Sequence, residues 1–349
     1  MEVLVPPHKL KFINNFAQEH NLKIHIKVRN YGRFLDEKIG PVTLKSSDPV
    51  FTYHSYKAIQ KMYNKLAKQN PKLIKVENLG KSFEGRQMEL VKISENPKAK
   101  NPIIFIDAGI HAREWVAPAT ALYFIHQLVK PSNAADLHNI DYYILPVVNP
   151  DGYEFSRTQR RMWRKTRSTS KNTKCHGVDG NRNFDYKWGE LNAVKDPCNF
   201  GTYIGPTAFS EAETKIVRKV LEKYHDRIKL YMDLHSYGQL ILYPWGWSEA
   251  AKIENYEKIH SLGTKVERAM VKAGAKPFEV KSAAKLYLTT GSSIDYAYKT
   301  GIPYAYAVEL TDGHEFDFPE SKLYSTLPPF YKGLQAFAQH LRKEFRARH

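Results

Sequence analysis

NPIIFIDAGIHAREW, residues 101–115, joins a strand pattern to a helix pattern. The apolar run Ile103–Ile106 lies between Asn101-Pro102 and Gly109, which is typical of a buried strand that ends in a turn. A helical pattern begins at Trp115. Because sites in open α/β sheets form where strands end, His111 and Glu114 lie where a site is expected.

The three-residue spacing of His111 and Glu114 is weak evidence by itself. With 14 histidines and 36 acidic residues in 349 positions, chance gives about 1.4 such pairs. The chain contains three others, His138/Asp141, His176/Asp179 and His314/Asp317. The predicted strand end, rather than the spacing, distinguishes His111.

Predicted strands alternate with predicted helices along most of the chain. We expect strands at 89–93, 103–106, 142–148, 228–234 and 304–310, and helices at 55–70, 115–129, 210–224 and 255–273. Ser210, with Glu213 three residues later, has the pattern of a helix cap. This alternation predicts an α/β fold with a mostly parallel or mixed sheet covered on both faces.

The first 50 residues have a different pattern. Residues 9–20 have helical spacing, and residues 22–28 alternate between apolar and polar as a strand does. Turn and linker residues occupy 37–49. We interpret this stretch as a boundary and a candidate site of proteolysis, with Lys38 and Lys45 as basic cleavage points.

Composition is that of a folded globular protein. Hydrophobic residues make up 42% and charged residues 26%, and no apolar run approaches the ~20 residues of a membrane span. A net charge of +17 and a pI of about 9.5 favour anionic partners or surfaces. The basic residues are spread along the chain without a nucleic-acid-binding motif, so we expect a basic solvated surface, no nucleic acid and no membrane span.

Cys175 and Cys198 are the only cysteines. They are either two free thiols or one disulfide that closes a loop rich in Gly, Asn and Asp. A disulfide would indicate an oxidising compartment. The N-terminal residues lack the basic flank and long apolar core of a secretion signal, so export would need a signal that is not present in this chain.

Ionisable residues follow several predicted strands. His111 and Glu114 follow one strand, His235 follows another, and Glu309 ends a third. Two histidines and one carboxylate, with a fourth position open, are the ligands of a catalytic zinc site. Such a site makes hydroxide available near neutral pH.

Six motifs occur in a fixed order from residue 111 onward. They are HAREW (111–115), NPDGY (149–153), WRKTR (163–167), VDGNRN (178–183), LHSY (234–237) and VEL (308–310). Together they resemble the zinc carboxypeptidases of the carboxypeptidase A/B family, and most closely the pancreatic-type A enzymes. The resemblance spans about residue 50 to the C-terminus. It implies a mixed, mostly parallel eight-stranded sheet between helices, a secreted monomer that acts on peptide or protein C-termini, and a disulfide between Cys175 and Cys198.

The resemblance also divides the chain in two. Residues 1–45 are similar to the C-terminal part of an inhibitory pro-segment with its linker, and residues 46–349 to the catalytic domain. A full pro-domain would be about twice as long, so the resemblance implies a truncated zymogen.

The resemblance assigns roles in catalysis. His111, Glu114 and His235 would bind one Zn²⁺ per chain, and Asp179 would orient His111. The remaining assignments are Glu309 as general base and Arg164 as the cation that stabilises charge on the carbonyl oxygen.

Further positions match substrate contacts. Arg182 and Asn181 would bind the terminal carboxylate of the peptide. Residues further back on the peptide would meet Arg113 and Tyr237, and Tyr287 would close over the bound substrate. Ser236 is a further substrate-binding position.

Ile294 matches the base of the pocket for the terminal side chain, which is acidic in family members that remove Lys or Arg. An apolar base gives a cation no partner, so we expect removal of hydrophobic or aromatic residues. The same pocket would be lined by Leu242, Gly246, Thr289 and Ala307. Because Asp295 is adjacent, removal of Lys or Arg is the alternative within the family, and a catalytically silent binding homologue is the alternative outside it.

Overall fold

A computed structural model describes residues 5, 9–26, 48–170, 173–191, 193–312 and 316–345. The chain forms two compact units, residues 1–43 and 44–349. In the first unit, helix α1 (Leu10–Glu19) confirms the predicted helix at 9–20. Residues 22–26 have no strand conformation, so the strand predicted at 22–28 is wrong over these five positions; residues 27–28 lie outside the described ones. A strand is stable only when a neighbour accepts its hydrogen bonds, and alternation alone does not supply one.

The second unit is built on one eight-stranded sheet with the order β1-β2-β4-β3-β5-β8-β6-β7. Four neighbouring pairs are parallel and three are antiparallel, which confirms the mixed, mostly parallel sheet. The strands are β1 (Ile74–Lys81), β2 (Gln87–Ile93), β3 (Ile103–Ala108), β4 (Asp141–Leu145), β5 (Ile228–His235), β6 (Leu240–Tyr243), β7 (Glu279–Ser282) and β8 (Tyr304–Glu309).

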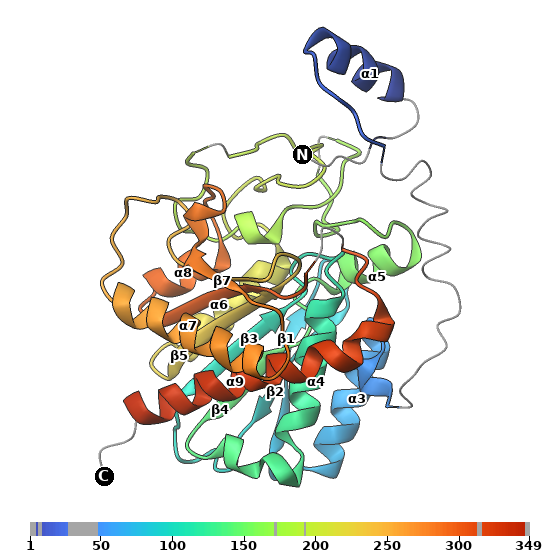
Figure 1. The fold of residues 1–349 in the computed structure, drawn as a ribbon. Coiled ribbons are helices and arrows are strands. Elements are labelled where there is room, and N and C mark those ends of the chain that lie inside the picture. The colour runs from blue at the N-terminus through green and yellow to red at the C-terminus, as the bar shows by residue number, and fades with distance from the viewer. Residues whose placement is uncertain are drawn as a thin grey trace. The chain divides into compact units, whose positions relative to one another are not determined.

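Helices cover both faces of this sheet (Figure 1). The α-helices of this unit are α3 (Tyr56–Gln69), α4 (Val116–Leu128), α5 (Pro150–Thr158), α6 (Ala212–Lys223), α7 (Tyr256–Lys272), α8 (Ser293–Lys299) and α9 (Leu323–Glu344). Short 3-10 segments lie at 49–51, 131–137, 180–182, 283–285 and 320–322. One core contains apolar residues of α3, α4, α7 and α9, and the other contains those of α6 and α8. Strand β3 contributes Ile104 and Ile106 to the first core and Ile103 and Phe105 to the second, as alternation along a strand requires.

Two local predictions differ from the structure. The N-cap of α6 is Glu211 and not Ser210, whose hydroxyl instead donates to the Glu211 carboxylate at 2.8 Å. Strand β4 ends at Leu145 rather than at Val148, because Pro146 has no N–H with which to continue the ladder.

The three central strands β3, β5 and β8 are parallel neighbours, so their carboxyl ends lie at one edge of the sheet. In this register Ala108 is opposite Leu234, and His235 is opposite Glu309. Residues predicted from separate parts of the sequence therefore meet at this edge.

Cys175 and Cys198 form a disulfide, as the resemblance implied. Among the residues described, no helix has the length and apolar character needed to cross a membrane.

Candidate active site

The turn after β3 brings His111 and Glu114 to the edge of the sheet. Gly109 has a φ of +67°, and a Cβ at this position would lie 2.9 Å from the Pro118 side chain. Only glycine fits such a close approach at positive φ without displacing α4. A residue outside the turn also stabilises it, because the Ala112 N–H donates a hydrogen bond to the Arg164 carbonyl at 3.0 Å.

His111, Glu114 and His235 converge at the carboxyl ends of β3 and β5, and all three are buried. The Nδ1 atoms of the two histidines are 3.1 Å apart. The Glu114 carboxylate lies 2.9 Å from His111 Nδ1 through Oε1 and 3.0 Å from His235 Nδ1 through Oε2. This is the one group of three or more His, Cys, Asp or Glu side chains in the described residues that could hold a metal ion.

The outer nitrogen of each histidine contacts a buried carboxylate. His111 Nε2 is 3.0 Å from Asp179 Oδ1, and His235 Nε2 is 2.8 Å from Asp233 Oδ2. When a carboxylate accepts a hydrogen bond from Nε2–H of a neutral imidazole, Nδ1 is unprotonated and its lone pair is available to a metal. The Nδ1 lone pairs of His111 and His235 and the Glu114 carboxylate are then directed toward one point. Donors 2.9–3.1 Å apart are close to the roughly 3.3 Å between ligands of a tetrahedral zinc, so these residues fit a zinc ion.

Asp233 was not predicted from the sequence. It lies two residues before His235 on β5, and its Oδ2 also accepts a hydrogen bond from the Ser293 hydroxyl at 2.6 Å. On the neighbouring strand, Asp107 is opposite Asp233 and accepts from the Tyr231 hydroxyl at 2.9 Å. Burial and the Asp233 carboxylate raise the pKa of Asp107 well above its usual value. The sequence pattern that could have indicated them is an aspartate inside each of two otherwise apolar strands.

Asp179 fixes the guanidinium of Arg164 close to the Glu114 carboxylate. Its Nε and Nη2 donate to Asp179 Oδ2 at 3.2 and 2.9 Å, and its Nη1 is 3.8 Å from Glu114 Oε1. Burial opposes ionisation of Asp179, but Arg164, Arg182 and His111 hold its pKa well below the ordinary value. Asp179 therefore orients one histidine and one guanidinium at the same time.

Glu309 ends β8 beside His235, with which it pairs in register. Burial, reinforced by the Glu114 carboxylate and opposed by His235 and Arg164, raises the pKa of Glu309 to about 8. A carboxyl group with a pKa near the working pH can both accept and return a proton.

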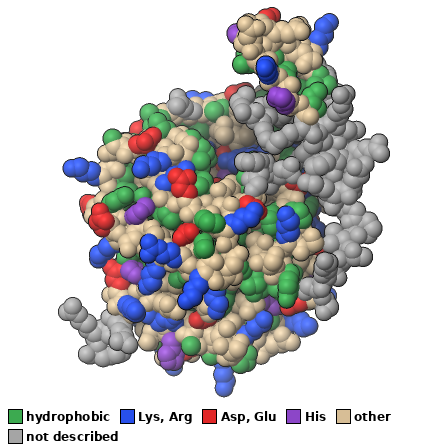
Figure 2. Space-filling view, viewed as in Figure 1, with side chains coloured by type: hydrophobic (Ala, Val, Ile, Leu, Met, Phe, Trp, Pro, Cys, Tyr) green, Lys and Arg blue, Asp and Glu red, His purple; other side chains and the backbone are tan. Residues whose placement is uncertain are grey.

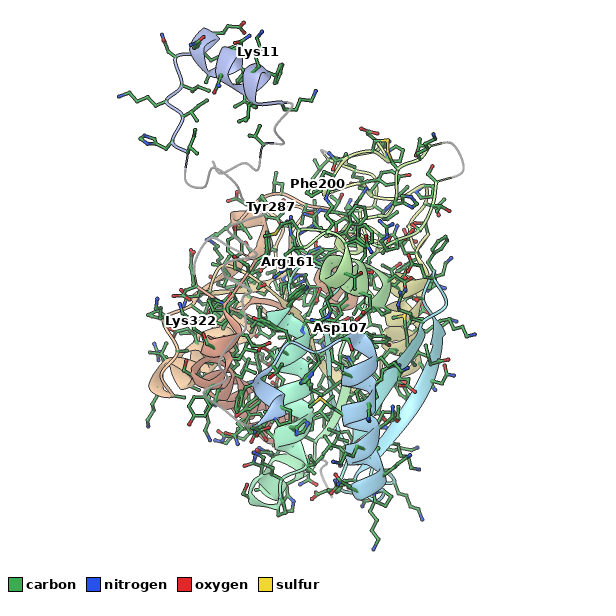
Figure 3. The ribbon with its side chains drawn as sticks, turned by 90° about the vertical axis from the view of Figure 1, so that its right-hand side faces the viewer. Lys11, Asp107, Arg161, Phe200, Tyr287 and Lys322 are labelled. Atoms are coloured by element: carbon green, nitrogen blue, oxygen red, sulfur yellow. A yellow bond between two sulfur atoms is a disulfide. The ribbon has the colours of Figure 1, made fainter. Side chains whose placement is uncertain are left out.

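Arg182, Asn181 and Tyr287 lie near each other. Arg182 Nη2 donates to the Tyr287 hydroxyl at 3.4 Å, and its guanidinium carbon is 5.6 Å from the centre of the Tyr287 ring. Asn181 Oδ1 accepts from the Ser293 N–H at 2.8 Å. Tyr287 is half exposed and lies at the surface in Figure 3.

The remaining predicted contact residues surround the same edge. The Ser236 N–H donates to Glu114 Oε2 at 3.2 Å. The rings of Tyr237 and Phe316 are 4.7 Å apart, and the Arg113 guanidinium lies 3.8 Å from the centre of the Phe316 ring. Burial and the charge of Arg164 lower the pKa of Arg113 to about 10.

Ile294 and Asp295 occupy different environments at the start of α8. Ile294 is buried in the same apolar cluster as Leu242 and Ala307, which are opposite each other in the β6–β8 register. The Asp295 carboxylate instead accepts the Gly246 N–H, at 3.0 Å from each of its oxygens. A Cβ added to Gly246 would meet Thr289 at 3.0 Å and Asp295 at 3.5 Å.

Comparison with known proteins identifies the family. The zinc carboxypeptidase family model matches residues 59–333. The chain belongs to the zinc carboxypeptidase family. Carboxypeptidase B of Astacus astacus is 38% identical and covers 84% of this chain and 98% of its own length; for human carboxypeptidase A6 the values are 34%, 98% and 81%. The crystal structure of a carboxypeptidase A from Helicoverpa armigera superposes with a TM-score of 0.88 at 31% identity, covering 96% of this chain and 87% of that one.

This zinc carboxypeptidase is therefore a metallocarboxypeptidase of the A/B family, an enzyme that hydrolyses peptides from the C-terminus. The relatives include both A-type and B-type enzymes, so family membership leaves the preferred terminal residue open. The family implies a zinc cofactor, and His111, Glu114 and His235 form a group that could hold it.

Proposed function

We propose that this zinc carboxypeptidase removes hydrophobic or aromatic residues from peptide C-termini. The proposal rests on the different environments of the adjacent residues Ile294 and Asp295. Ile294 lies among apolar side chains, whereas Asp295 directs both carboxylate oxygens to the backbone N–H of Gly246. A Lys or Arg side chain at Ile294 would meet apolar side chains, whereas the neighbouring Asp295 is buried and directed at the Gly246 N–H.

The proposed roles of the other residues follow from their positions. His111, Glu114 and His235 would hold one zinc ion, which would supply Lewis acidity for the hydrolysis. Glu309 accepts the proton of the attacking water and returns it to the leaving amine. Arg164, fixed by Asp179, stabilises the charge that develops on the carbonyl oxygen.

Substrate binding is assigned in the same way. Arg182 and Asn181 bind the terminal carboxylate, since a guanidinium recognises a carboxylate through two parallel hydrogen bonds. Tyr287 closes over the substrate from its half-exposed position. The peptide residues before the scissile bond contact Arg113, Ser236 and Tyr237.

The alternative within the family is removal of Lys and Arg. It is favoured by the similarity to carboxypeptidase B enzymes and by the carboxyl group of Asp295 beside Ile294. Against it, burial raises the pKa of Asp295 to about 7 even though the Gly246 and Trp247 N–H groups lower it, so its negative charge is suppressed near neutral pH.

The N-terminal unit and the setting of the enzyme are also part of the proposal. Residues 1–45 are a partial pro-segment with its linker, and the enzyme is secreted and monomeric. The disulfide supports an oxidising compartment. Lys38 and Lys45, the candidate activation sites, lie outside the described residues.

Two peptides that differ only in a C-terminal Phe or Arg test the specificity. We expect kcat/KM for Phe to exceed that for Arg by roughly 100-fold or more. Ile294→Asp should reverse the preference, and Asp295→Asn should leave it unchanged. Faster release of Arg by the native enzyme would contradict the proposal, as would loss of Arg release in Asp295→Asn alone.

A further inference from the structure

The net charge of +17 is not explained by the active site. On the face drawn in Figure 2, Lys and Arg side chains are interspersed with Asp and Glu. Such mixing favours solubility rather than a specific partner. A surface that binds a polyanion needs basic residues without acidic neighbours.

Helix α3 has this property. Between Ser55 and Val76 the sequence contains six lysines and no Asp or Glu. Four of the lysines, which we call the lysine ridge, are exposed and lie on α3: Lys57, Lys61, Lys65 and Lys68. At about 100° per residue they fall within about 80° of one another around the helix axis. The buried residues Tyr56, Ile59 and Tyr63 are on the opposite side, against the sheet.

The lysine ridge has no ion-pair partner among the described residues. The acidic side chains that contact α3 are Glu89 and Glu154, and both are occupied by neutral donors. Glu89 Oε2 accepts from the Tyr63 hydroxyl at 2.7 Å and from the amides of Gln60 and Asn64 at 3.2 and 3.3 Å. Glu154 accepts the Tyr56 N–H at 2.6 Å. The four ammonium groups are therefore available to an external anion.

The ridge is linear. With a rise of about 1.5 Å per residue, four charges extend over roughly 16 Å, or about 5–6 Å between successive lysines. Figure 3 shows α3 running along the side of the molecule that faces the viewer. A row of point charges along one axis is complementary to an extended polymer that carries a negative charge at each repeat.

The chemistry of α3 favours a polysaccharide over other polyanions. Single-stranded nucleic acid is bound by stacking on exposed aromatic rings, but Tyr56 and Tyr63 are buried. A membrane-surface helix inserts apolar side chains, and α3 exposes no large apolar residue. The closed disulfide points to an oxidising compartment outside the cytosol. A sulfated polysaccharide is a linear chain whose sulfate groups supply the repeated negative charge that the ridge would match. We propose that the lysine ridge of α3 binds a linear sulfated polysaccharide.

Such binding would leave the active site open. Strand β1, against which α3 packs, is at one edge of the sheet, and β3 is three strands away. At about 4.8 Å per strand this is roughly 14 Å, and the lysines face away from the sheet. The ridge therefore localises the enzyme without taking part in hydrolysis.

The test compares two quadruple variants of the full chain with equal charge. One changes the ridge, Lys57→Gln, Lys61→Gln, Lys65→Gln and Lys68→Gln. The control changes four exposed lysines on other helices, Lys219→Gln, Lys265→Gln, Lys272→Gln and Lys299→Gln, none of which has an ion pair among the described residues. Binding of heparin is measured by titration calorimetry at several salt concentrations, beside single-stranded DNA and phosphatidylserine vesicles. Release of the C-terminal residue from a small peptide reports folding.

We expect the ridge variant to lose heparin affinity about tenfold or more, and the slope of log K against log salt to fall by on the order of three, as four lost ionic contacts require. The control should change less than about twofold, and both variants should hydrolyse the peptide at the native rate. Equal losses in the two variants would overturn the proposal, because binding would then depend on net charge alone. Tighter ridge-dependent binding of DNA or vesicles than of heparin would overturn the assigned partner.

Discussion

At the scale of single residues, the candidate metal site depends on carboxylates that contact the outer ring nitrogens of its histidines. Asp179 and Asp233 each contact the Nε2 of one histidine, at 3.0 and 2.8 Å. These contacts leave Nδ1 of both rings directed toward Glu114, where a metal ion would bind. Because partners of this kind orient the ligand and raise its basicity, they contribute to affinity without touching the metal.

We predict that Asp233→Asn weakens zinc binding by about 10–100-fold, since the amide cannot provide the negative charge beside His235. The zinc dissociation constant is measured by competition with a chelator at fixed pH. Asp107→Asn is a matched control on the neighbouring strand: the pKa of Asp107 is raised well above its usual value by burial and by Asp233, so a neutral amide resembles its native state. Equal affinities of the native enzyme and Asp233→Asn would refute the role of Asp233.

The sequence predicted His111, Glu114 and His235 because each follows an apolar strand. It contained the information that Asp233 and His235 share one face of β5, since residues two apart in a strand point the same way. The contact between them could not be predicted, because it depends on the side-chain rotamers and on Ser293, which comes from α8.

At the scale of elements, helix α6 was predicted correctly, but its N-cap residue was not. The Ser210/Glu213 pattern predicted a reciprocal cap, but Glu213 turns inward. Its Oε1 accepts the Phe83 N–H at 3.1 Å, and its Oε2 is buried without a hydrogen-bond partner in the described structure. Burial, with Glu211 and Asp151 adding to it, raises the pKa of Glu213 to about 7.

This raised pKa makes stability depend on pH. Between about pH 4.5 and 7 the unfolded chain releases the Glu213 proton while the folded protein keeps it, so this residue lowers the free energy of unfolding as pH rises through that window. Glu213→Gln removes the effect. Its stability relative to the native protein should therefore increase by about 3 kcal/mol from pH 4.5 to 8, as measured by denaturant unfolding at both pH values. A difference that does not change with pH would mean that Glu213 is ionised in the folded protein.

Length alone does not explain which other elements were predicted. Helix α9 has 22 residues but was not predicted, because Pro328 and Pro329 inside it are typical of a helix boundary. Long periodic segments such as α7 and β5 were predicted within a few residues. Strands β6 and β7, with four residues each, are too short for a period to be recognised.

At the scale of the whole molecule, the site exists because one edge of the sheet collects residues from distant parts of the chain. The alternation of strands and helices predicted the fold class, and the family resemblance supplied the number of strands. The strand order, which makes β5 the neighbour of both β3 and β8, could not be predicted from periodicity, because it depends on tertiary pairing. That order converts His111, His235 and Glu309 from separate residues into one centre.

Removal of the metal should therefore weaken the whole catalytic unit as well as abolish hydrolysis. Without a cation, two histidine lone pairs and the Glu114 carboxylate face each other at 2.9–3.1 Å in a buried site. A ligand present at about 1,000 times its dissociation constant contributes about 4 kcal/mol. For a unit of this size we expect chelation to lower Tm by on the order of 5–10 °C, and added zinc to restore both Tm and activity.

His235→Ala is the control for this experiment, because it removes one ligand and cannot hold the metal tightly. Thermal unfolding is followed with and without chelator in both proteins. The variant should show the low Tm of the stripped enzyme and should not respond to chelator. If chelator left the native Tm unchanged while hydrolysis stopped, the metal would act only in catalysis. The convergence of ligands from the ends of β3 and β5 on one ion would then contribute nothing to the stability of the fold.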